Sequence, residues 1–482
     1  MTDNNSRIII VGGGPVGLTA AHALHKAGLD FLLLESRPEI VADAGSGLVL
    51  SAMGLRALSQ LGLLSAMNKE STPVDRFKRY DHKGKDIGET MFFTYFYQSH
   101  GALPRVFRRR DLMRAFWDTL PAECRTKVLP GKRVSAIHSS DDGVVVCCAD
   151  GSSYPGSLVI GADGAYSVVR KEMDLAQQRS APAPVTQKQP FLTTYRCFWL
   201  LAPTLPHTVI GDANETHGPE VTVQFFAGEE SAIMGVYERL ESPTRDPPRY
   251  TQVDEEAFIA KWGHLPLTKE AKLTLGEAYA QRIKCGLVNL EEGVVKHWSR
   301  GRMVLVGDAA HKFTPSTGSG CNNGIVDVVS LANQLHRAFA SGTPPTSEAL
   351  SAAFTAYQEE RFDVVKEDCG LAGNFTAMAT WNSFLLKFLD VHVFAYKFVQ
   401  RFLVDQGVGT TAKTPVFDYI EGKEEIVGSV PWVHAIPPPS SSSSNTQNID
   451  RWSSGIITRR GAFEFSAICI LRSLDLSLLL VT

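Results

Sequence analysis

The most constraining feature of this 482-residue chain is a glycine-rich turn near its N-terminus. The turn reads GGGPVG over residues 12–17, and it lies between the apolar run Ile8 to Val11 and a helical pattern that ends at Gly28. A second apolar run, Phe31 to Leu34, follows and closes with Glu35. Strand, turn, helix and strand in this order predict a right-handed βαβ unit within a parallel sheet.

Each glycine of the turn has its own physical role. Gly12 permits the tight turn, Gly14 lets a pyrophosphate approach the backbone, and Gly17 lets the helix pack closely on the sheet. The helix N-terminus offers amide donors and a partial positive charge to phosphates. Glu35 is placed to accept hydrogen bonds from ribose hydroxyls, and its charge disfavours a 2'-phosphate. The unit predicts a dinucleotide site but does not separate FAD from NAD.

Two later segments repeat the pattern of an apolar strand that runs into a glycine. Residues 159–170 read VIGADGAYSVVR and contain an Asp-Gly pair that begins at Asp163. Residues 303–315 read MVLVGDAAHKFTP and contain the pair Gly307-Asp308, after which GSGCNNG over residues 318–324 opens a long helix. Each glycine-ended strand leads toward a helix start.

The three motifs, in this order and at this spacing, resemble the class A flavoprotein monooxygenases, which include hydroxylases of the para-hydroxybenzoate and salicylate type. The resemblance covers roughly residues 7–370. It implies an α/β fold with a Rossmann-like FAD-binding domain built on a parallel sheet, a β-sheet-rich substrate domain and C-terminal helices. The domains expected are an FAD-binding domain from residues 1–71, 106–180 and 296–370, a substrate domain from 72–105 and 181–295, a helical region at 371–435, and a low-complexity linker with an apolar tail at 436–482. The aromatic stretch from Thr72 to Val106 is predicted to form strands.

The resemblance also implies roles for residues of the second and third motifs. Asp308, after Gly307, is expected to bind the ribityl chain of FAD. The helix start that contains Gly320 is expected to direct backbone amides at the flavin ring. Asp163 is associated with both FAD and NAD(P)H binding. His311 is expected to hold the turn rather than donate a proton, and Asp327 is expected to be a cap or a surface group.

Three further contacts with FAD follow from the resemblance. Arg109, in the run RRRDL, matches an R-x-x-L position that contacts FAD, although Arg108 and Arg110 leave the register open. Val49 and Cys321 occupy positions where relatives carry small residues that contact FAD through their backbones. The stretch GSGLVLSAMG around Val49 departs from the more usual ASIGLHPNG.

The chemistry implied is oxygen transfer with NADPH or NADH as the co-substrate that reduces FAD. Addition of O2 gives a flavin C4a-hydroperoxide, whose distal oxygen an electron-rich alkene or phenol attacks. The protein then has to position the substrate and exclude water, so no catalytic triad or metal site is expected. Arg196 stands where related hydroxylases place an active-site arginine, and the alternative is an inter-strand or surface ion pair. A few of eight aromatic residues are expected to line the pocket: Phe92, Phe93, Tyr95, Phe96, Phe198, Trp199, Phe225 and Phe226.

The substrate is indicated by the run FTPSTGSGCNNGIVD and by Tyr195-Arg196-Cys197. Both resemble fungal monooxygenases of meroterpenoid and indole-diterpene pathways, which epoxidise a terminal prenyl double bond before a membrane terpene cyclase acts. This resemblance implies a prenylated substrate and a terpene cyclase in the same pathway. Aromatic hydroxylation of the salicylate type is the alternative activity. A non-catalytic flavoprotein is the alternative of another class.

Composition bears on partners and location. A formal net charge of -3 indicates no nucleic-acid partner. The eight cysteines contain no CxxC pair and favour a reducing, cytoplasmic environment. Residues 463–481 are apolar but include Glu464, Arg472 and Asp475, which makes them a weak candidate for a membrane anchor. The helical pattern from Ser383 to Val404 is expected either to dock on the core or to rest on a membrane surface.

Overall fold

The computed structural model describes residues 6–42, 47–179 and 189–440. A six-stranded sheet forms one part of the fold. Its strands run in the order β18 (Ser299–Arg300), β19 (Met303–Leu305), β12 (Leu158–Gly161), β1 (Ile8–Val11), β2 (Phe31–Leu34) and β8 (Val128–Leu129). All neighbours pair in parallel except β18 and β19. Every residue of β1 and β2 is buried, because helices cover both faces of such a sheet. The predicted βαβ unit and α/β fold class are confirmed.

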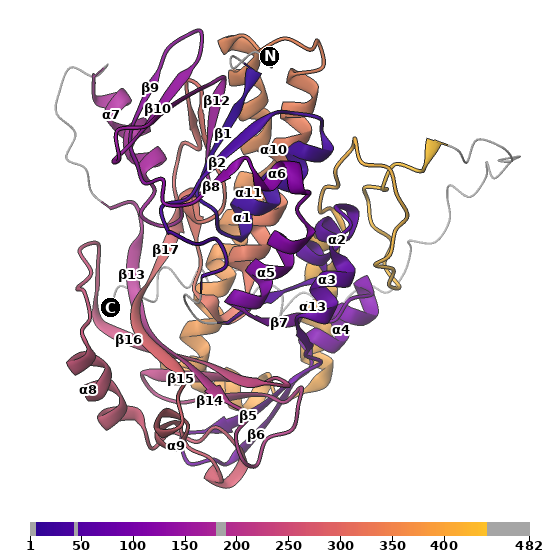
Figure 1. Cartoon of the computed structure of the whole chain (residues 1–482). Helices are drawn as coiled ribbons and strands as arrows, with labels where there is room; N and C mark the ends of the chain where they lie inside the picture. The colour runs from indigo at the N-terminus through magenta and orange to yellow at the C-terminus, as the bar shows by residue number, and fades with distance from the viewer. Residues whose placement is uncertain (1–5, 43–46, 180–188, 441–482) are drawn as a thin grey trace, which may run out of the picture. The chain divides into compact units, whose positions relative to one another are not determined.

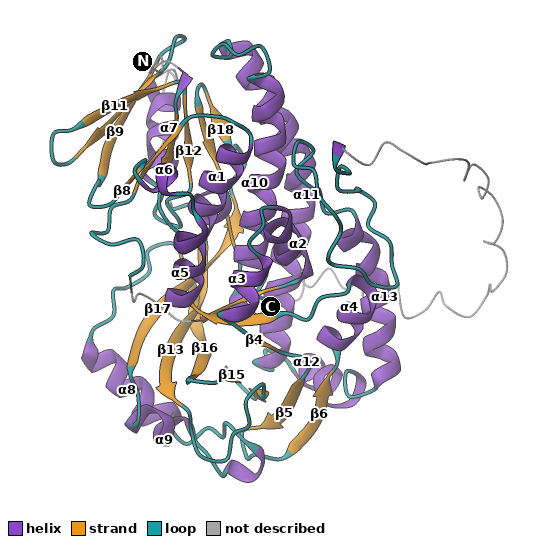
Figure 2. Cartoon of the chain, turned by 45° about the vertical axis from the view of Figure 1, so that its right-hand side comes forward, coloured by secondary structure: helices purple, strands orange, loops and turns teal. Residues whose placement is uncertain are grey.

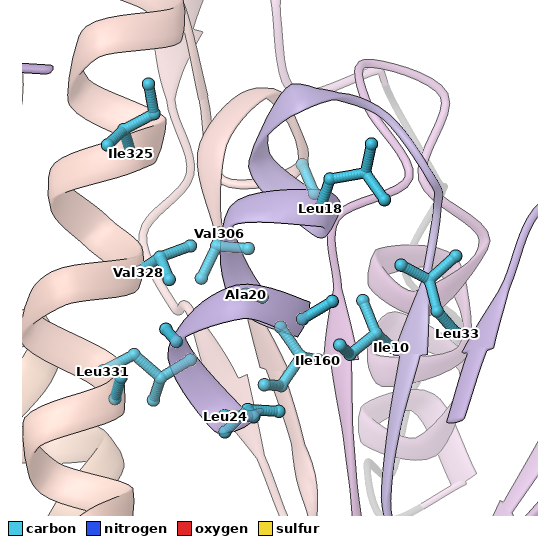
Figure 3. Packing of buried hydrophobic residues seen from close by; sticks show 14 of the residues in the cluster. Ile10, Leu18, Ala20, Leu24, Leu33, Ile160, Val306, Ile325, Val328 and Leu331 are labelled. Carbon is cyan, nitrogen blue, oxygen red and sulfur yellow. The ribbon is translucent and has the colours of Figure 1, made fainter. Parts of the chain in front are cut away.

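Helix α1 (Pro15–Lys26) follows the glycine turn and packs between this sheet and the long helix α10 (Ser319–Ala338). Figure 3 shows the apolar side chains that meet there, among them Leu24 of α1, Ile160 of β12 and Leu331 of α10. Helices α5 (Arg109–Thr119) and α11 (Ser347–Ala379) contact α1 and α10 respectively. This packing fixes the starts of α1 and α10 with respect to the carboxyl ends of the parallel strands.

An eight-stranded sheet forms the second half of the fold (Figure 1). Its strands run in the order β20 (His311–Lys312), β17 (Lys284–Val294), β13 (Leu192–Pro203), β16 (Ser231–Thr244), β15 (Val221–Ala227), β14 (Ala213–His217), β5 (Phe77–Asp81) and β6 (Asp86–Thr90). Only β14 and β5 pair in parallel. Helices α8 (Gln252–Trp262) and α9 (Leu275–Ala280) cover one face, where Phe198 stacks on Phe258 at 5.2 Å between ring centroids.

Smaller elements complete the described part of the chain. One three-stranded sheet consists of β11 (Ser153–Gly156), β10 (Val144–Cys148) and β9 (Val134–Ser139), and another of β3 (Gly47–Leu50), β7 (Arg105–Arg108) and β4 (Thr72–Pro73). The remaining α-helices are α2 (Ala52–Gln60), α3 (Leu64–Lys69), α4 (Phe92–His100), α6 (Ala122–Arg125), α7 (Val168–Arg179), α12 (Phe384–Phe388) and α13 (Lys397–Ala412), shown in purple in Figure 2.

Residues 92–100 are helical as α4, so the prediction of strands throughout Thr72 to Val106 is wrong there. Consecutive aromatic residues favour strands by propensity, but packing decides here. Phe92 lies edge-on to Phe375 at 5.7 Å and Phe93 lies against Phe77 at 5.3 Å. Gly101, with φ of 84°, ends the helix in the left-handed conformation.

The C-terminal helical pattern is interrupted rather than continuous. Residues predicted as one helix from Ser383 to Val404 form α12, a π-helical turn at Leu389–Val393, and the first part of α13. By their contacts, the described residues up to Pro437 form one compact unit. In the described residues, none of the helices combines the length and the apolar character that a membrane crossing needs. The predicted anchor at 463–481 lies outside the described residues.

Candidate functional site

A cavity of about 390 Å³ opens where the glycine turn, the start of α10 and the eight-stranded sheet meet. Its first wall carries residues of the sequence motifs, namely Gly14, Val49, Arg109, Asp308, Gly320 and Cys321. Its second wall comes mainly from the eight-stranded sheet and α4, with Phe77, Phe93, Trp199, Gln224, Phe226 and Tyr237. The tertiary structure thus brings all three motifs to one cavity, because the carboxyl ends of parallel strands lie at one edge of a sheet.

The glycine turn has the local geometry that a phosphate site requires. Gly12 has φ of 105°, and a β-carbon on it would collide with the carbonyl of Ala162. A β-carbon on Gly17 would collide with the carbonyl of Gly12. At Gly14, by contrast, a β-carbon would meet nothing within 4 Å. The space beside Gly14, at the N-terminus of α1, therefore suits a pyrophosphate that approaches the backbone.

Glu35 is held against the turn rather than at the cavity wall. Its side chain is buried, with one carboxylate oxygen accepting from the amide of Gly13 at 2.6 Å and the other from the amide of Arg37 at 2.7 Å. The hydroxyl of Ser36 also donates to the oxygen that accepts from Arg37, at 3.1 Å, so the oxygen bonded to Gly13 is the one that keeps a lone pair. Its role at the ribose stays a prediction.

One carboxylate oxygen of Asp163 accepts hydrogen bonds and the other does not. Oδ2 accepts from the amides of Val168 and Val169, at 2.6 and 3.1 Å, and so caps α7. Oδ1 is buried without a hydrogen-bond partner among the described residues. Burial raises the pKa of Asp163. Its chain neighbours Ala162 and Gly164 line the cavity, whereas Asp163 itself does not, so its role toward the dinucleotide stays a prediction.

A hydrogen bond to Asp327 of helix α10 holds the Gly307-Asp308 turn in place. The amide of Gly307 donates to Oδ2 of Asp327 at 3.0 Å, and the ring of His311 reaches the same oxygen at 2.5 Å. Arg361 donates to the other oxygen of Asp327 at 3.0 Å. Burial would raise the pKa of Asp327, but its contacts with His311 and Arg361 hold it below its ordinary value. Asp327 is fully buried, so the expectation of a cap or surface group is wrong.

Asp308 and the start of α10 face the cavity together. The carboxylate of Asp308 has no partner among the described residues. α10 begins at Ser319, after Gly318 with φ of 67°, and its first amides have no partner within the helix. Burial raises the pKa of Cys321 to about 12, so its thiol is neutral. The expected roles of Asp308 toward a ribityl chain and of Gly320 and Cys321 toward a ring fit this arrangement.

Asn322 is a residue of the site to which the sequence pattern assigns no role. Its side-chain amide donates to the carbonyl of Val49 at 2.9 Å and accepts from the amide of Ser51 at 2.9 Å. It thereby fixes β3 against the start of α10. Its position within GSGCNNG, at the opening of the helix, is the only signal in the sequence.

The three arginines of the run RRRDL lie in different surroundings. Arg109, the first residue of α5, lines the cavity and forms no ion pair with a described residue. Arg108 pairs with Asp111 and Glu230 instead, and Arg110 is exposed. Arg109 is thus the arginine available to an anionic ligand.

Arg196 points away from the cavity. It lies opposite Glu238 on β16, and its Nε donates to that carboxylate at 2.6 Å. Its neighbours Cys197 and Trp199 line the cavity, whereas the Arg196 guanidinium lies over the Phe258 ring at 5.5 Å on the other face. The geometry corresponds to the inter-strand ion pair and not to an active-site arginine.

Three of the eight candidate aromatic residues line the cavity: Phe93, Trp199 and Phe226. Phe198 and Phe225 belong to the core on the opposite face of the sheet. Phe77 and Tyr237 line the cavity but were not among the candidates. The alternation of a strand is the signal for the face, since residues two apart point the same way.

Comparison with known proteins agrees with this site. Residues 5–368 match the model of the FAD binding domain. An FAD-dependent monooxygenase from Alternaria brassicicola is 31% identical over 404 residues, which is 80% of this chain and 75% of that protein. The chain belongs to this family of FAD-dependent monooxygenases. FAD is thus the dinucleotide that the three motifs serve.

Another relative is longer than this chain. An FAD-dependent monooxygenase from Penicillium polonicum is 32% identical over 394 residues, and the match spans 79% of this chain but 48% of that protein. The chain therefore spans about half the length of that relative.

Solved structures share the fold at low sequence identity. HpxO of Klebsiella pneumoniae, complexed with FAD and uric acid, is 20% identical with a TM-score of 0.67, over 84% of this chain and 96% of HpxO. A salicylate hydroxylase substrate complex is 19% identical with a TM-score of 0.62, over 85% and 98% of the two chains. At this identity, the two structures show the fold family and leave the substrate open.

Proposed function

We propose that this monooxygenase uses NADPH or NADH and O2 to epoxidise the prenyl chain of a meroterpenoid or related terpenoid in fungal secondary metabolism. The proposal is supported by an apolar region at the sheet side of the cavity. The ring of Phe77 lies 5.3 Å from that of Phe93 and 5.4 Å from that of Phe226. Val106 and Ile233 join them. Such a lining suits a branched hydrocarbon chain.

The single observation that carries the proposal is how the ionisable side chains on the sheet side of the cavity are protonated or paired. Among the described residues of the sheet side, these are Cys197, Tyr237 and Lys312. Burial raises the pKa of Cys197 to about 12 and that of Tyr237 well above its ordinary value. Lys312 is paired with Glu291 at 2.8 Å. An alkene needs no deprotonation, whereas a phenol is activated by a base or a free cation, so the arrangement favours the alkene.

The protein's contribution is to hold and orient the reactants. FAD, when bound, supplies the electron transfer and the activation of oxygen. The first amides of α10 stabilise negative charge on a ring placed against them, because the helix N-terminus carries a partial positive charge. The aromatic residues of the sheet side exclude water and hold the alkene.

Two wider elements belong to the same proposal. A terpene cyclase is expected to consume the epoxide. Association with a membrane surface is supported by exposed aromatic residues near the C-terminal helices, since Phe384 and Phe398 are 85% and 72% exposed.

The test uses the purified holoenzyme with NADPH, labelled O2 and a farnesylated aromatic acid. We expect one labelled oxygen atom in the farnesyl chain, at the terminal double bond. The matched control is the same acid with a saturated chain, which should not be oxygenated. Ring hydroxylation of both acids would establish the aromatic hydroxylase instead. Bound flavin without oxygen transfer to either acid would contradict epoxidation of this substrate class and favour a non-catalytic flavoprotein.

A further inference from the structure

Four residues form one row across the cavity face of the eight-stranded sheet. Gly286 on β17 lies opposite Trp199 on β13, Trp199 lies opposite Gly235 on β16, and Gly235 lies opposite Gln224 on β15. Trp199, Gly235 and Gln224 line the cavity. Two glycines thus flank the only tryptophan of the described cavity wall.

The glycines leave space that aromatic rings fill. A β-carbon on Gly286 would lie 2.7 Å from Nε1 of Trp199, so the indole lies across that glycine. A β-carbon on Gly235 would lie 2.5 Å from the hydroxyl of Tyr237, so the phenol ring lies across the second one. The two rings therefore lie over the backbone of the sheet at these glycines, and we call this pair of rings the floor of the cavity.

The hydrogen bonds of this floor use the proton of the Tyr237 hydroxyl but not its oxygen. Tyr237 donates its hydroxyl proton to Oε1 of Gln224 at 3.0 Å. The side-chain nitrogen of Gln224 donates to the carboxylate of Glu215 at 2.8 Å and to the carbonyl of Ser316 at 3.1 Å. The phenol oxygen of Tyr237 is thus left as an acceptor.

Trp199 supplies the complementary donor. Its indole N–H forms no hydrogen bond with a described residue. The nitrogen is not among the fully buried atoms that lack a partner, so it is accessible. A buried or half-buried indole N–H ordinarily finds a partner. On the sheet side of the cavity, the hydroxyl proton of Tyr237 and the side-chain amide of Gln224 are already engaged, and Lys312 is paired with Glu291.

We propose that Trp199 determines substrate specificity by donating its indole N–H to an oxygen atom on the head group of the substrate. The substrate class is then a prenylated aromatic or polyketide ring that carries a carbonyl, carboxylate or phenolic oxygen. The identity of the prenylated substrate rests on the proposed function. The donor role of Trp199 rests on the geometry of the floor alone.

The test compares the binding of two probes to the holoenzyme, measured by the change in the visible flavin spectrum. One probe is a farnesylated aromatic acid, and the other is farnesylbenzene, which lacks oxygen. We expect wild type to prefer the acid. We expect Trp199→Phe to weaken binding of the acid by about 10- to 100-fold, the range of one hydrogen bond to a charged group, and to leave binding of farnesylbenzene unchanged. Equal weakening of both probes, or a change in FAD affinity with unchanged probe preference, would overturn the donor role.

A second variant tests how the ring is held. In Gly286→Ala the new methyl group displaces the indole, so we expect weaker binding of both probes, while bound flavin shows that the fold is retained. The matched control is Gly370→Ala, at an exposed helical position where a β-carbon meets nothing within 4 Å, and it should bind both probes as wild type does. If Gly286→Ala binds both probes as wild type does, the glycine gap does not hold the ring and the floor is wrong.

Oxygen transfer is a separate readout. If the acid is bound in a Trp199-dependent way but its chain is not oxygenated, the proposed function fails and the specificity role stands. If the prenyl chain of the acid is epoxidised but Trp199→Phe leaves the preference for the acid intact, the proposed function stands and the specificity role of Trp199 fails.

Discussion

The amide of Gly307 donates to the buried carboxylate of Asp327 at 3.0 Å, which ties the third glycine turn to the interior of α10. The turn that carries Asp308 is therefore not positioned by its own sequence alone. It depends on a charged group 20 residues later in the chain, and that group is itself in contact with His311 and Arg361. The FAD site and the stability of the helix pair α10 and α11 are coupled through this carboxylate.

Asp327→Asn is predicted to be strongly destabilising. The neutral side chain keeps the shape but removes the buried ion pair with Arg361, which costs about 3–5 kcal/mol of unfolding free energy. Urea unfolding at a fixed FAD concentration measures the loss. The control is Asp405→Asn, whose pair with Arg401 is exposed and contributes at most about 1 kcal/mol. Equal effects of the two substitutions would contradict the role of Asp327.

Gly14→Ala and Gly17→Ala are predicted to separate binding from folding. The methyl group at position 14 meets open space, so the unfolding free energy of the apoprotein should stay within about 0.5 kcal/mol of wild type. The same methyl group takes the space of a phosphate, and FAD binding should weaken about tenfold, or by ~1.4 kcal/mol. Gly17→Ala collides with the Gly12 carbonyl and should cost about 1–3 kcal/mol of stability. Fluorescence titration with FAD and urea unfolding give the two quantities.

Arg109→Ala is predicted to weaken FAD binding by about 10- to 100-fold, the range for a lost hydrogen bond to a charged group. The reason is that Arg109 lines the cavity without a described counter-ion. Arg108→Ala is the matched control, because its guanidinium is taken up by Asp111 and Glu230. A larger loss in Arg108→Ala would reverse the assignment of the two positions.

His217 is predicted to make stability depend on pH in the alkaline range. Burial alone would lower the pKa of His217, but Asp390 at 2.9 Å and Glu215 raise it from 6.5 to about 9. Folding therefore takes up a proton, and this contribution is complete below pH 6.5 and lost as the pH rises through about 9. It corresponds to about 3 kcal/mol at one pKa unit per ~1.4 kcal/mol. The unfolding free energies of wild type and His217→Asn, measured from pH 6 to 10, should converge as the pH rises; a constant difference would contradict the charged state.

The local parts of the FAD site were predictable from the sequence. Gly12, Gly14 and Asp308 stand at turns whose chemistry depends on a few neighbouring residues, and the apolar runs before them identify buried parallel strands. The helix α4 was not predictable in this way, because its aromatic residues favour strands locally. Contacts such as Phe92 with Phe375, far away in the chain, decide its conformation.

The sequence by itself determined that this chain builds a dinucleotide fold with three glycine turns, and the resemblance of those turns gave the flavin family. Only the tertiary structure decided which side chains reach the cavity. It turned Arg196 away, chose Arg109 over its neighbours, buried Asp327, and set Trp199 between two glycines on adjacent strands. The physical reason is strand register: a shift of one residue moves a side chain to the opposite face of the sheet, and pairing between distant strands fixes it.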